Sequence, residues 1–134
     1  PTHDCDSRTA YDEMYWVSEY EKSLGMSAHY FLTVHYFRDA GYLSDFYNAE
    51  TKPKAQRLLV DGHTVGSHSI CHFPDFSKTE LFPATVVTKD AYAVSAHHDK
   101  TTGVTQGGST WAELGLSKLI IEEDLGNHVR SFRS

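Results

Sequence analysis

Two pairs of polar residues have types and spacings suited to chemistry. His68 and His72 stand four residues apart, and Asp4 and Asp6 stand two apart. On a helical turn, imidazoles at positions i and i+4 lie on one side and both reach a metal ion at about 2.0–2.1 Å. In an extended segment, carboxylates two residues apart point the same way and lie about 6–7 Å apart. One carboxylate would then bind a metal while the other stays out of the ligand set.

Two histidines and one carboxylate are typical of a catalytic metal site, because they leave positions open for water and substrate. A divalent ion in such a site lowers the pKa of a water molecule towards about 7 and polarises a carbonyl group. The second carboxylate would accept the proton from that water. The pattern therefore predicts metal-assisted hydrolysis, with zinc as the expected ion.

Other interpretations of the same residues stay open. The chain contains nine histidines, so a pair at spacing four also arises by chance. An Asp-x-Asp sequence is common in turns and at helix entries, where it would cap the next helix. Ser69 lacks a Gly-x-Ser-x-Gly context and is expected to hold the ligand loop rather than act as a nucleophile. Cys5 and Cys71 are either two free thiols or one disulfide.

Composition limits the partners. The 134 residues have a formal net charge of −6 and no block of Lys or Arg, so we expect no nucleic-acid partner. No apolar run approaches the roughly 18 residues of a transmembrane helix, so we expect no membrane span. Hydrophobic residues make up 40% and charged residues 22%, as in one globular domain over 1–134. Both ends read as interiors of elements, so we expect part of a longer catalytic domain.

Predicted strands and helices alternate along the chain. Apolar periodicity and helix-ending residues predict helices over 11–24, 51–62 and 110–125. β-rich runs predict strands over 27–34, 64–67, 84–88 and 129–132, with 2–7 at the end of a first strand. The alternation predicts an α/β fold with parallel strands, whose functional sites lie at the carboxyl ends of the strands. Both polar pairs fall at such ends.

The chain also contains motifs that resemble a known family. Residues 62–72 read Gly-His-Thr-Val-Gly-Ser-His-Ser-Ile-Cys-His. This run resembles the second motif of the NodB-type polysaccharide deacetylases (carbohydrate esterase family 4), which is His-[Ser/Thr]-x-x-His after a Gly-rich strand. Residues 2–7 resemble the Asp-x-Asp variant of the first motif. The helix, glycine and strand that precede Arg133 resemble the approach to the third motif, and the resemblance leaves out roughly 36–50 and 75–108.

The resemblance implies a distorted parallel (β/α)7-type barrel, of which this chain is a part. It also implies a metal-dependent hydrolase that removes N-acetyl groups from a polysaccharide or amino sugar, in the cell envelope or outside the cell. In that scheme the metal ligands are Asp6, His68 and His72. Asp4 is the general base, and Arg133 pairs with Asp4 and orients it. The family's general acid, a histidine, is expected beyond the end of this sequence.

Three points remain open at this stage. An O-acetyl carbohydrate esterase would use the same metal and base, and a silent carbohydrate-binding domain would keep the fold without needing Asp4. Ser134 stands where the third motif usually has proline. Aromatic residues in the predicted loop either stack on sugar rings or fill space beneath the loop; they are Tyr36, Phe37, Tyr42, Phe46 and Tyr47.

Overall fold

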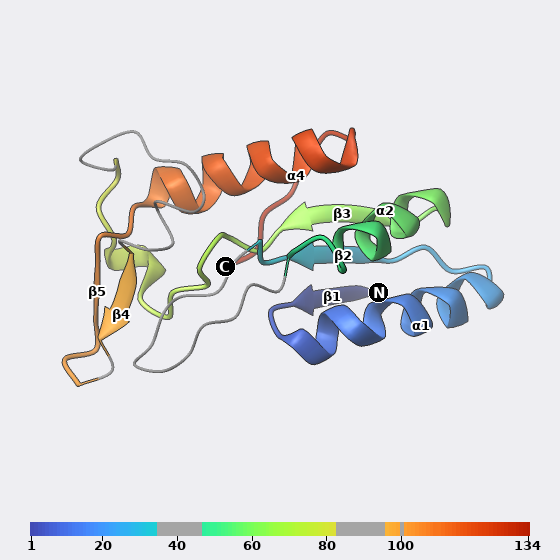
Figure 1. Cartoon of the computed structure of the whole chain (residues 1–134), viewed down its shortest axis with the longest axis horizontal. Coiled ribbons are helices and arrows are strands. Elements are labelled where there is room, and N and C mark those ends of the chain that lie inside the picture. Colours follow the sequence, from blue (N-terminus) through green and yellow to red (C-terminus); the bar gives the residue numbers. More distant parts are fainter. Residues whose placement is uncertain (35–46, 83–95, 100) are drawn as a thin grey trace.

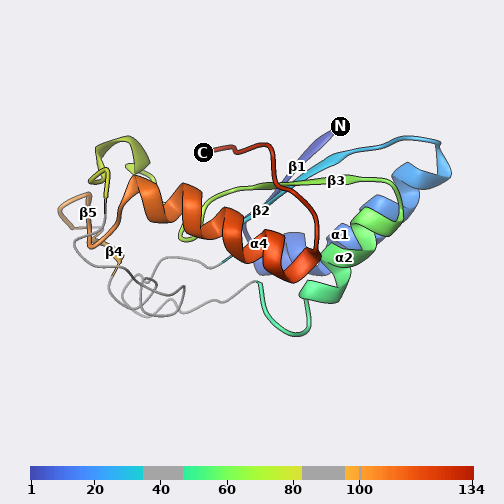
Figure 2. The same cartoon turned by 90° about the horizontal axis from the view of Figure 1, so that it is seen from above.

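The computed structural model describes residues 1–34, 47–82, 96–99 and 101–134. Within these ranges the chain is a mixed α/β fold with a three-stranded parallel sheet and three α-helices. The strands lie in the order β1 (Thr2–Cys5), β2 (His29–Leu32) and β3 (Thr64–Ser67). The helices are α1 (Arg8–Ser23), α2 (Lys52–Val60) and α4 (Ser117–Leu125). Figure 2 shows all three helices on the same side of the sheet.

Smaller elements lie between β3 and α4. They are the 3₁₀ turn η1 (Phe76–Lys78), the antiparallel hairpin of β4 (His97–Asp99) and β5 (Val104–Gln106), and the π-helical turn η2 (Ala112–Leu116). The sequence predicts neither strand of this hairpin, because runs of three residues are too short to show a period of two. The predicted strand over 84–88 lies outside the described residues. Among the helices described, none is both long and apolar enough to cross a membrane.

The predicted strand over 129–132 is wrong. Phe132 forms only an isolated parallel bridge with Ser67. The Ser67 N–H donates to the Ser131 carbonyl and the Arg133 N–H donates to the Ser67 carbonyl, both at 3.0 Å. The segment over 129–134, called here the C-terminal segment, therefore runs beside β3 without forming a ladder.

Local sequence sets the two ends of α1. The hydroxyl of Ser7 accepts a hydrogen bond from the Ala10 N–H at 3.1 Å, so Ser7, rather than the aspartate pair, caps the helix. The helix therefore begins three residues earlier than predicted. At its other end Gly25 has a φ of 70°, and the Met26 N–H donates to the Glu21 carbonyl at 2.9 Å. This is a Schellman ending, which favours glycine because the left-handed region suits a residue without Cβ.

The two faces of the sheet have different roles. The face beneath the helices forms the core with α1, and its members include Cys5, Tyr11, Met14, Tyr30, Leu32 and Val65. Tyr47, one of the aromatic residues considered for sugar stacking, is fully buried in this core. The other four lie outside the described residues. On the opposite face the strand register places Asp4, Phe31 and Gly66 in one row across the sheet.

Gly66 is required by the close approach of the C-terminal segment. A Cβ at this position would lie 2.5 Å from Ser131 Oγ and 2.6 Å from His29 Nε2. These two atoms are themselves hydrogen bonded at 2.6 Å, and His29 Nδ1 pairs with Thr64 Oγ1. His29 is thus a satisfied structural histidine, and the space left by Gly66 lets the segment cross the row that contains Asp4.

A buried polar network lies at the amino end of the sheet, away from the predicted site. Glu21 is only 6% exposed, and its two carboxylate oxygens pair at 2.7 Å with His3 Nε2 and with the Tyr30 hydroxyl. His63 immediately precedes β3, and its Nδ1 lies 4.0 Å from the same carboxylate. Burial raises the pKa of Glu21, but the hydrogen bonds from His3 and Tyr30 outweigh it and leave the pKa below its ordinary value of 4.5.

This network predicts how the fold responds to acid. Because the pKa of Glu21 is lower in the folded chain, its carboxylate stabilises the fold fully above pH 4.5, and that stability is lost as the pH falls through the folded value. Glu21→Gln, which cannot titrate, should flatten the dependence of the unfolding free energy on pH below 4.5 in urea titrations. Glu123→Gln, at an exposed position on α4, should behave as wild type. An unchanged pH dependence in Glu21→Gln would refute this role.

Candidate metal centre

The structure brings together the three residues predicted as metal ligands. Asp6 follows β1 and His68 follows β3, so both lie at the carboxyl end of the sheet, where the C-terminus also lies (Figure 1). One ligand atom from each of Asp6, His68 and His72 lies within 4.8 Å of the other two. The two histidine Nε2 atoms are 3.0 Å apart, and His72 Nε2 lies 3.9 Å from Asp6 Oδ2.

These distances fit one shared ion. With zinc to ligand bonds of about 2.0–2.1 Å, neighbouring ligand atoms of a tetrahedral site lie about 3.3 Å apart. The distance of 3.0 Å between the two Nε2 atoms is slightly shorter than this value, and the distance of 3.9 Å from His72 Nε2 to Asp6 Oδ2 is slightly longer. The donor set of two imidazoles and one carboxylate is also the set that zinc and other first-row divalent ions accept. The three residues could therefore hold such an ion with small adjustments of side-chain position.

His68 is already oriented for metal binding. Its side chain is buried, and its Nδ1 lies 2.8 Å from the backbone carbonyl of Arg133. Since a carbonyl only accepts hydrogen bonds, Nδ1 is the donor, and the tautomer with this proton leaves the lone pair on Nε2. Nε2 is the atom that faces His72. A hydrogen bond to the remote ring nitrogen commonly fixes both the tautomer and the ring of a histidine ligand.

The backbone between the two histidines is a loop and not the helical turn that their spacing predicts. Ser69 has a φ of 73° and His72 a φ of 55°. Both values lie in the left-handed region, which residues other than glycine seldom adopt. The Ser69 hydroxyl accepts a hydrogen bond from the His72 N–H at 2.9 Å, so Ser69 holds the loop as expected. The loop brings the two imidazoles together by strained turns, and such strain is often found at functional sites.

His72 is in the protonation state that binds metal. Burial lowers the pKa of His72, the neighbouring His68 lowers it further, and the negative charges of Asp6 and Asp4 partly oppose these effects. The imidazole is therefore neutral near pH 7, and only a neutral imidazole can be a ligand.

Arg133 reaches Asp4 across the row on the open face of the sheet. Its Nη1 donates to Asp4 Oδ1 at 2.8 Å, and its Nη2 donates to Thr2 Oγ1 at 3.1 Å. The guanidinium carbon lies 4.4 Å from the centre of the Phe31 ring, within the range of a cation–π contact. The pairing of Arg133 with Asp4 is therefore present, and Asp4 is not one of the three clustered ligands.

The two cysteines are buried and free, which settles the choice between thiols and a disulfide. Burial raises the pKa of Cys5 to about 12, and the nearby charges of Asp6 and Asp4 add to this. Burial also raises the pKa of Cys71, together with the adjacent Glu113. Both thiols stay protonated at neutral pH, so neither supplies a thiolate ligand.

A cavity of about 350 Å³ opens beside His72. Its volume falls within the range of roughly 300–1,000 Å³ that is usual for small-molecule sites. Its lining combines aromatic rings with hydroxyl groups, and includes His72, Phe73, Pro74, Phe76, Ser77 and Ser134. The ring of Phe76 also contacts that of Phe132, with centroids 5.6 Å apart. The cavity joins the ligand loop to the C-terminal segment.

Two contacts at this site were missed by sequence reasoning. The backbone carbonyl of Arg133 orients His68, and the carboxylate of Glu113 accepts hydrogen bonds from the loop between the histidines. No sequence motif predicts the contact of the Arg133 carbonyl with His68, because every residue has a backbone carbonyl. The sequence does contain one indication that Glu113 is buried: it is flanked by apolar residues in a predicted helix.

We compared the chain with protein-family models, with curated proteins and with solved structures, and found no match in any of the three.

Removing one ligand should abolish tight metal binding. His72→Ala should weaken zinc binding by more than about 100-fold, beyond the loss expected when only an outer contact of a metal site is removed. Competition with a chromophoric chelator measures the dissociation constant. His128→Ala is the matched control, because His128 is exposed after α4 and pairs with Glu122. Equal zinc affinity in both variants would rule out His72 as a ligand.

Proposed function

We propose that this chain is part of a metal-dependent hydrolase that removes N-acetyl groups from a polysaccharide or amino sugar. The proposal rests on one observation: Asp6, His68 and His72 converge, while Asp4 stays outside the ligand group and is held by Arg133. A purely structural metal site has no use for an additional oriented carboxylate, whereas hydrolysis needs a base. The arrangement therefore favours catalysis.

Each residue has a defined part in the proposed reaction. A divalent ion bound at this site, with zinc as the proposed ion, would polarise the acetyl carbonyl and lower the pKa of a water molecule. Asp4 takes the proton of that water as the oxygen adds to the acetyl carbon. Arg133 keeps the carboxylate of Asp4 in place through its hydrogen bond of 2.8 Å. The C–N bond then breaks as the nitrogen takes up the proton that Asp4 accepted, Asp4 returns to its carboxylate form, and acetic acid and the amine are released.

The cavity beside His72 supports a carbohydrate substrate. Sugar rings have apolar faces that pack on aromatic side chains and hydroxyl groups that pair with polar ones. Phe73 and Phe76 supply the rings, and Ser77 and Ser134 supply hydroxyls. In this position a sugar would present an N-acetyl group next to His72. We therefore propose an N-acetylated carbohydrate as the substrate.

We also propose that the fold belongs to a distorted parallel (β/α)7-type barrel. Three parallel strands with their helices on one side are the arrangement of consecutive β/α units. The C-terminal segment lies beside β3, where the next strand of a barrel would lie. In a barrel the open face with Asp4 and Phe31 would line the interior, and the metal ligands would lie at the carboxyl ends of the strands.

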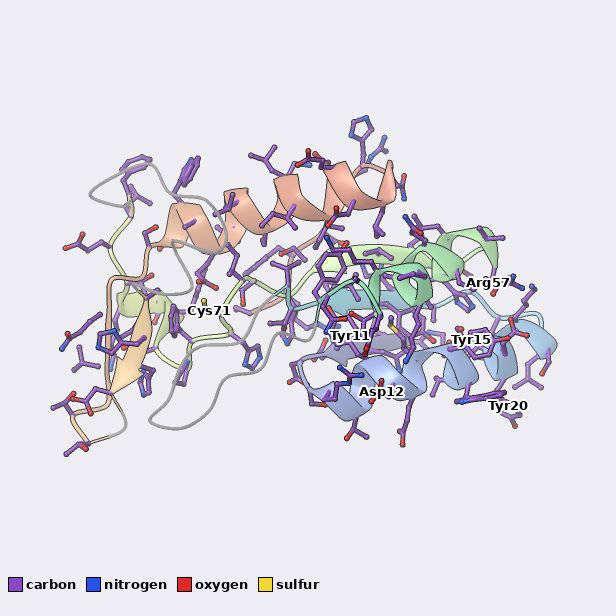
Figure 3. All side chains as sticks on the ribbon, in the orientation of Figure 1. Tyr11, Asp12, Tyr15, Tyr20, Arg57 and Cys71 are labelled. Carbon is purple, nitrogen blue, oxygen red and sulfur yellow. The ribbon has the colours of Figure 1, made fainter. Side chains whose placement is uncertain are left out.

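Asp4→Asn tests the base. It should lower kcat for amine release from N-acetylglucosamine oligomers by at least about 100-fold, the usual lower bound for a general base, while zinc affinity stays within a few-fold of wild type. Asp12→Asn is the control, because Asp12 is an aspartate of α1 (Figure 3), and it pairs with Arg8 and Lys54. Full activity of Asp4→Asn, activity that survives chelation, or cleavage of O-acetyl groups alone would each contradict the proposal.

Filling the cavity tests the substrate site. Ser77 is exposed at the cavity, so Ser77→Trp should occupy part of it without disturbing the core. We expect kcat/KM for the same oligomers to fall at least about tenfold, because ligand pockets bury most of their ligand, with zinc affinity unchanged. Ser23→Trp, at an exposed position at the end of α1, should leave kcat/KM unchanged. Equal activity of the two variants would remove the cavity from the substrate site.

A further inference from the structure

We propose that Glu113 is a positioning residue for the metal centre, because it holds the loop that carries His72. This inference rests on the proposed function, since it concerns the same site. It goes further by assigning a role to a residue that touches neither metal nor substrate. The strain of the loop is the starting point: Ser69 and His72 both have left-handed backbone angles. Without contacts that hold it, such a loop would relax and move the His72 imidazole.

One carboxylate holds the centre of the loop, between the two residues with left-handed backbone angles. Glu113 is fully buried, and its Oε2 accepts hydrogen bonds from the N–H groups of Ile70 and Cys71, at 3.0 and 2.9 Å. Ile70 and Cys71 are also fully buried and lie between the two strained residues. Leaving either of these two buried N–H groups without an acceptor would cost free energy and destabilise the folded loop. A single oxygen therefore satisfies both amides at the centre of the loop, and the Ser69 hydroxyl satisfies the N–H of His72.

Glu113 is itself held against β3. Its N–H donates to the Ser109 carbonyl at 3.0 Å, and its carbonyl accepts from the Ser117 hydroxyl at 2.5 Å. Ser117 Oγ in turn pairs with Ser67 Oγ, in the last residue of β3, at 2.6 Å. These bonds connect the π-helical turn η2 to the strand that delivers His68, and π-helical turns are frequent at functional sites.

The position of Glu113 shows that it orients the loop and does not belong to the cluster of metal ligands. Its Oε2 is directed at the backbone of the loop, and it is not part of the cluster of ligand atoms formed by Asp6, His68 and His72. Figure 3 places Cys71 beyond the carboxyl ends of the strands, in the loop whose backbone Glu113 binds. Glu113 therefore acts on the metal through the conformation of the loop.

Two substitutions distinguish positioning from general support of the core. Glu113→Gln keeps a carbonyl oxygen at the same reach, and this oxygen can accept both N–H groups. Glu113→Asp keeps the carboxyl group but withdraws the acceptor by one methylene. We expect Glu113→Gln to bind zinc within a few-fold of wild type and Glu113→Asp to bind it about 10–100-fold more weakly, the usual cost of losing an outer contact of a metal site.

Two measurements report on the loop besides affinity. The absorption spectrum of the Co²⁺-loaded protein should change in Glu113→Asp, because it depends on ligand geometry, and should be retained in Glu113→Gln. In metal-free protein, hydrogen exchange of the Ile70 and Cys71 amides should speed up in Glu113→Asp alone. The control is Glu21→Asp, the same change in a buried glutamate that binds His3 and Tyr30 instead. It should keep zinc affinity and the Co²⁺ spectrum even if it lowers stability.

The outcomes separate the inference from the function on which it rests. If wild type binds zinc and Glu113→Asp binds it equally well with an unchanged Co²⁺ spectrum, the role of Glu113 is refuted and the metal centre stands. Equal weakening in Glu113→Asp and Glu21→Asp would also refute it, because the effect would then reflect global stability. If wild type binds no zinc, the proposed function itself fails, and the inference fails with it.

Discussion

The packing of the C-terminal segment against β3 is the constraint on which the site depends. Gly66 leaves the space for this packing, and two backbone hydrogen bonds to Ser67 set its register. In that register Arg133 places its guanidinium over Phe31 and against Asp4, and its carbonyl against His68. One residue thus supports both the proposed base and a proposed ligand. Arg133 and Asp4 are 129 positions apart in the chain, so their contact exists only when β1 and the C-terminal segment are packed on the same sheet.

Buried carboxylates organise both ends of the sheet. At the amino end Glu21 joins α1 to the strands through His3 and Tyr30. At the carboxyl end Glu113 joins η2 to the loop that follows β3. A buried carboxylate costs free energy unless several donors surround it, and each of these has at least two. The difference lies in the donors: they are side chains at the amino end, and at the proposed site they are backbone N–H groups between two residues with left-handed angles.

The proposed metal centre is also where local conformational preferences are violated. Ser69 and His72 have left-handed backbone angles, and η2 interrupts regular α-helical geometry. Both features lie next to the ligand loop, whereas α1 follows ordinary capping rules at each end. Among the described residues, the positive φ angles of non-glycine residues are confined to this loop, and backbone strain of this kind is common at functional sites.

The amino-acid sequence alone determined the regular elements and the identity of the polar residues. The strand over 64–67 and the glycines that end α1 and α4 could be predicted, because periodicity and capping depend on residues within a few positions of each other. Only the tertiary structure decided the shape of the loop to His72, the place of Glu113 and the contacts of Arg133. These depend on atoms far apart in the chain that meet only when β3, η2 and the C-terminal segment pack together, and local patterns carry no record of such contacts.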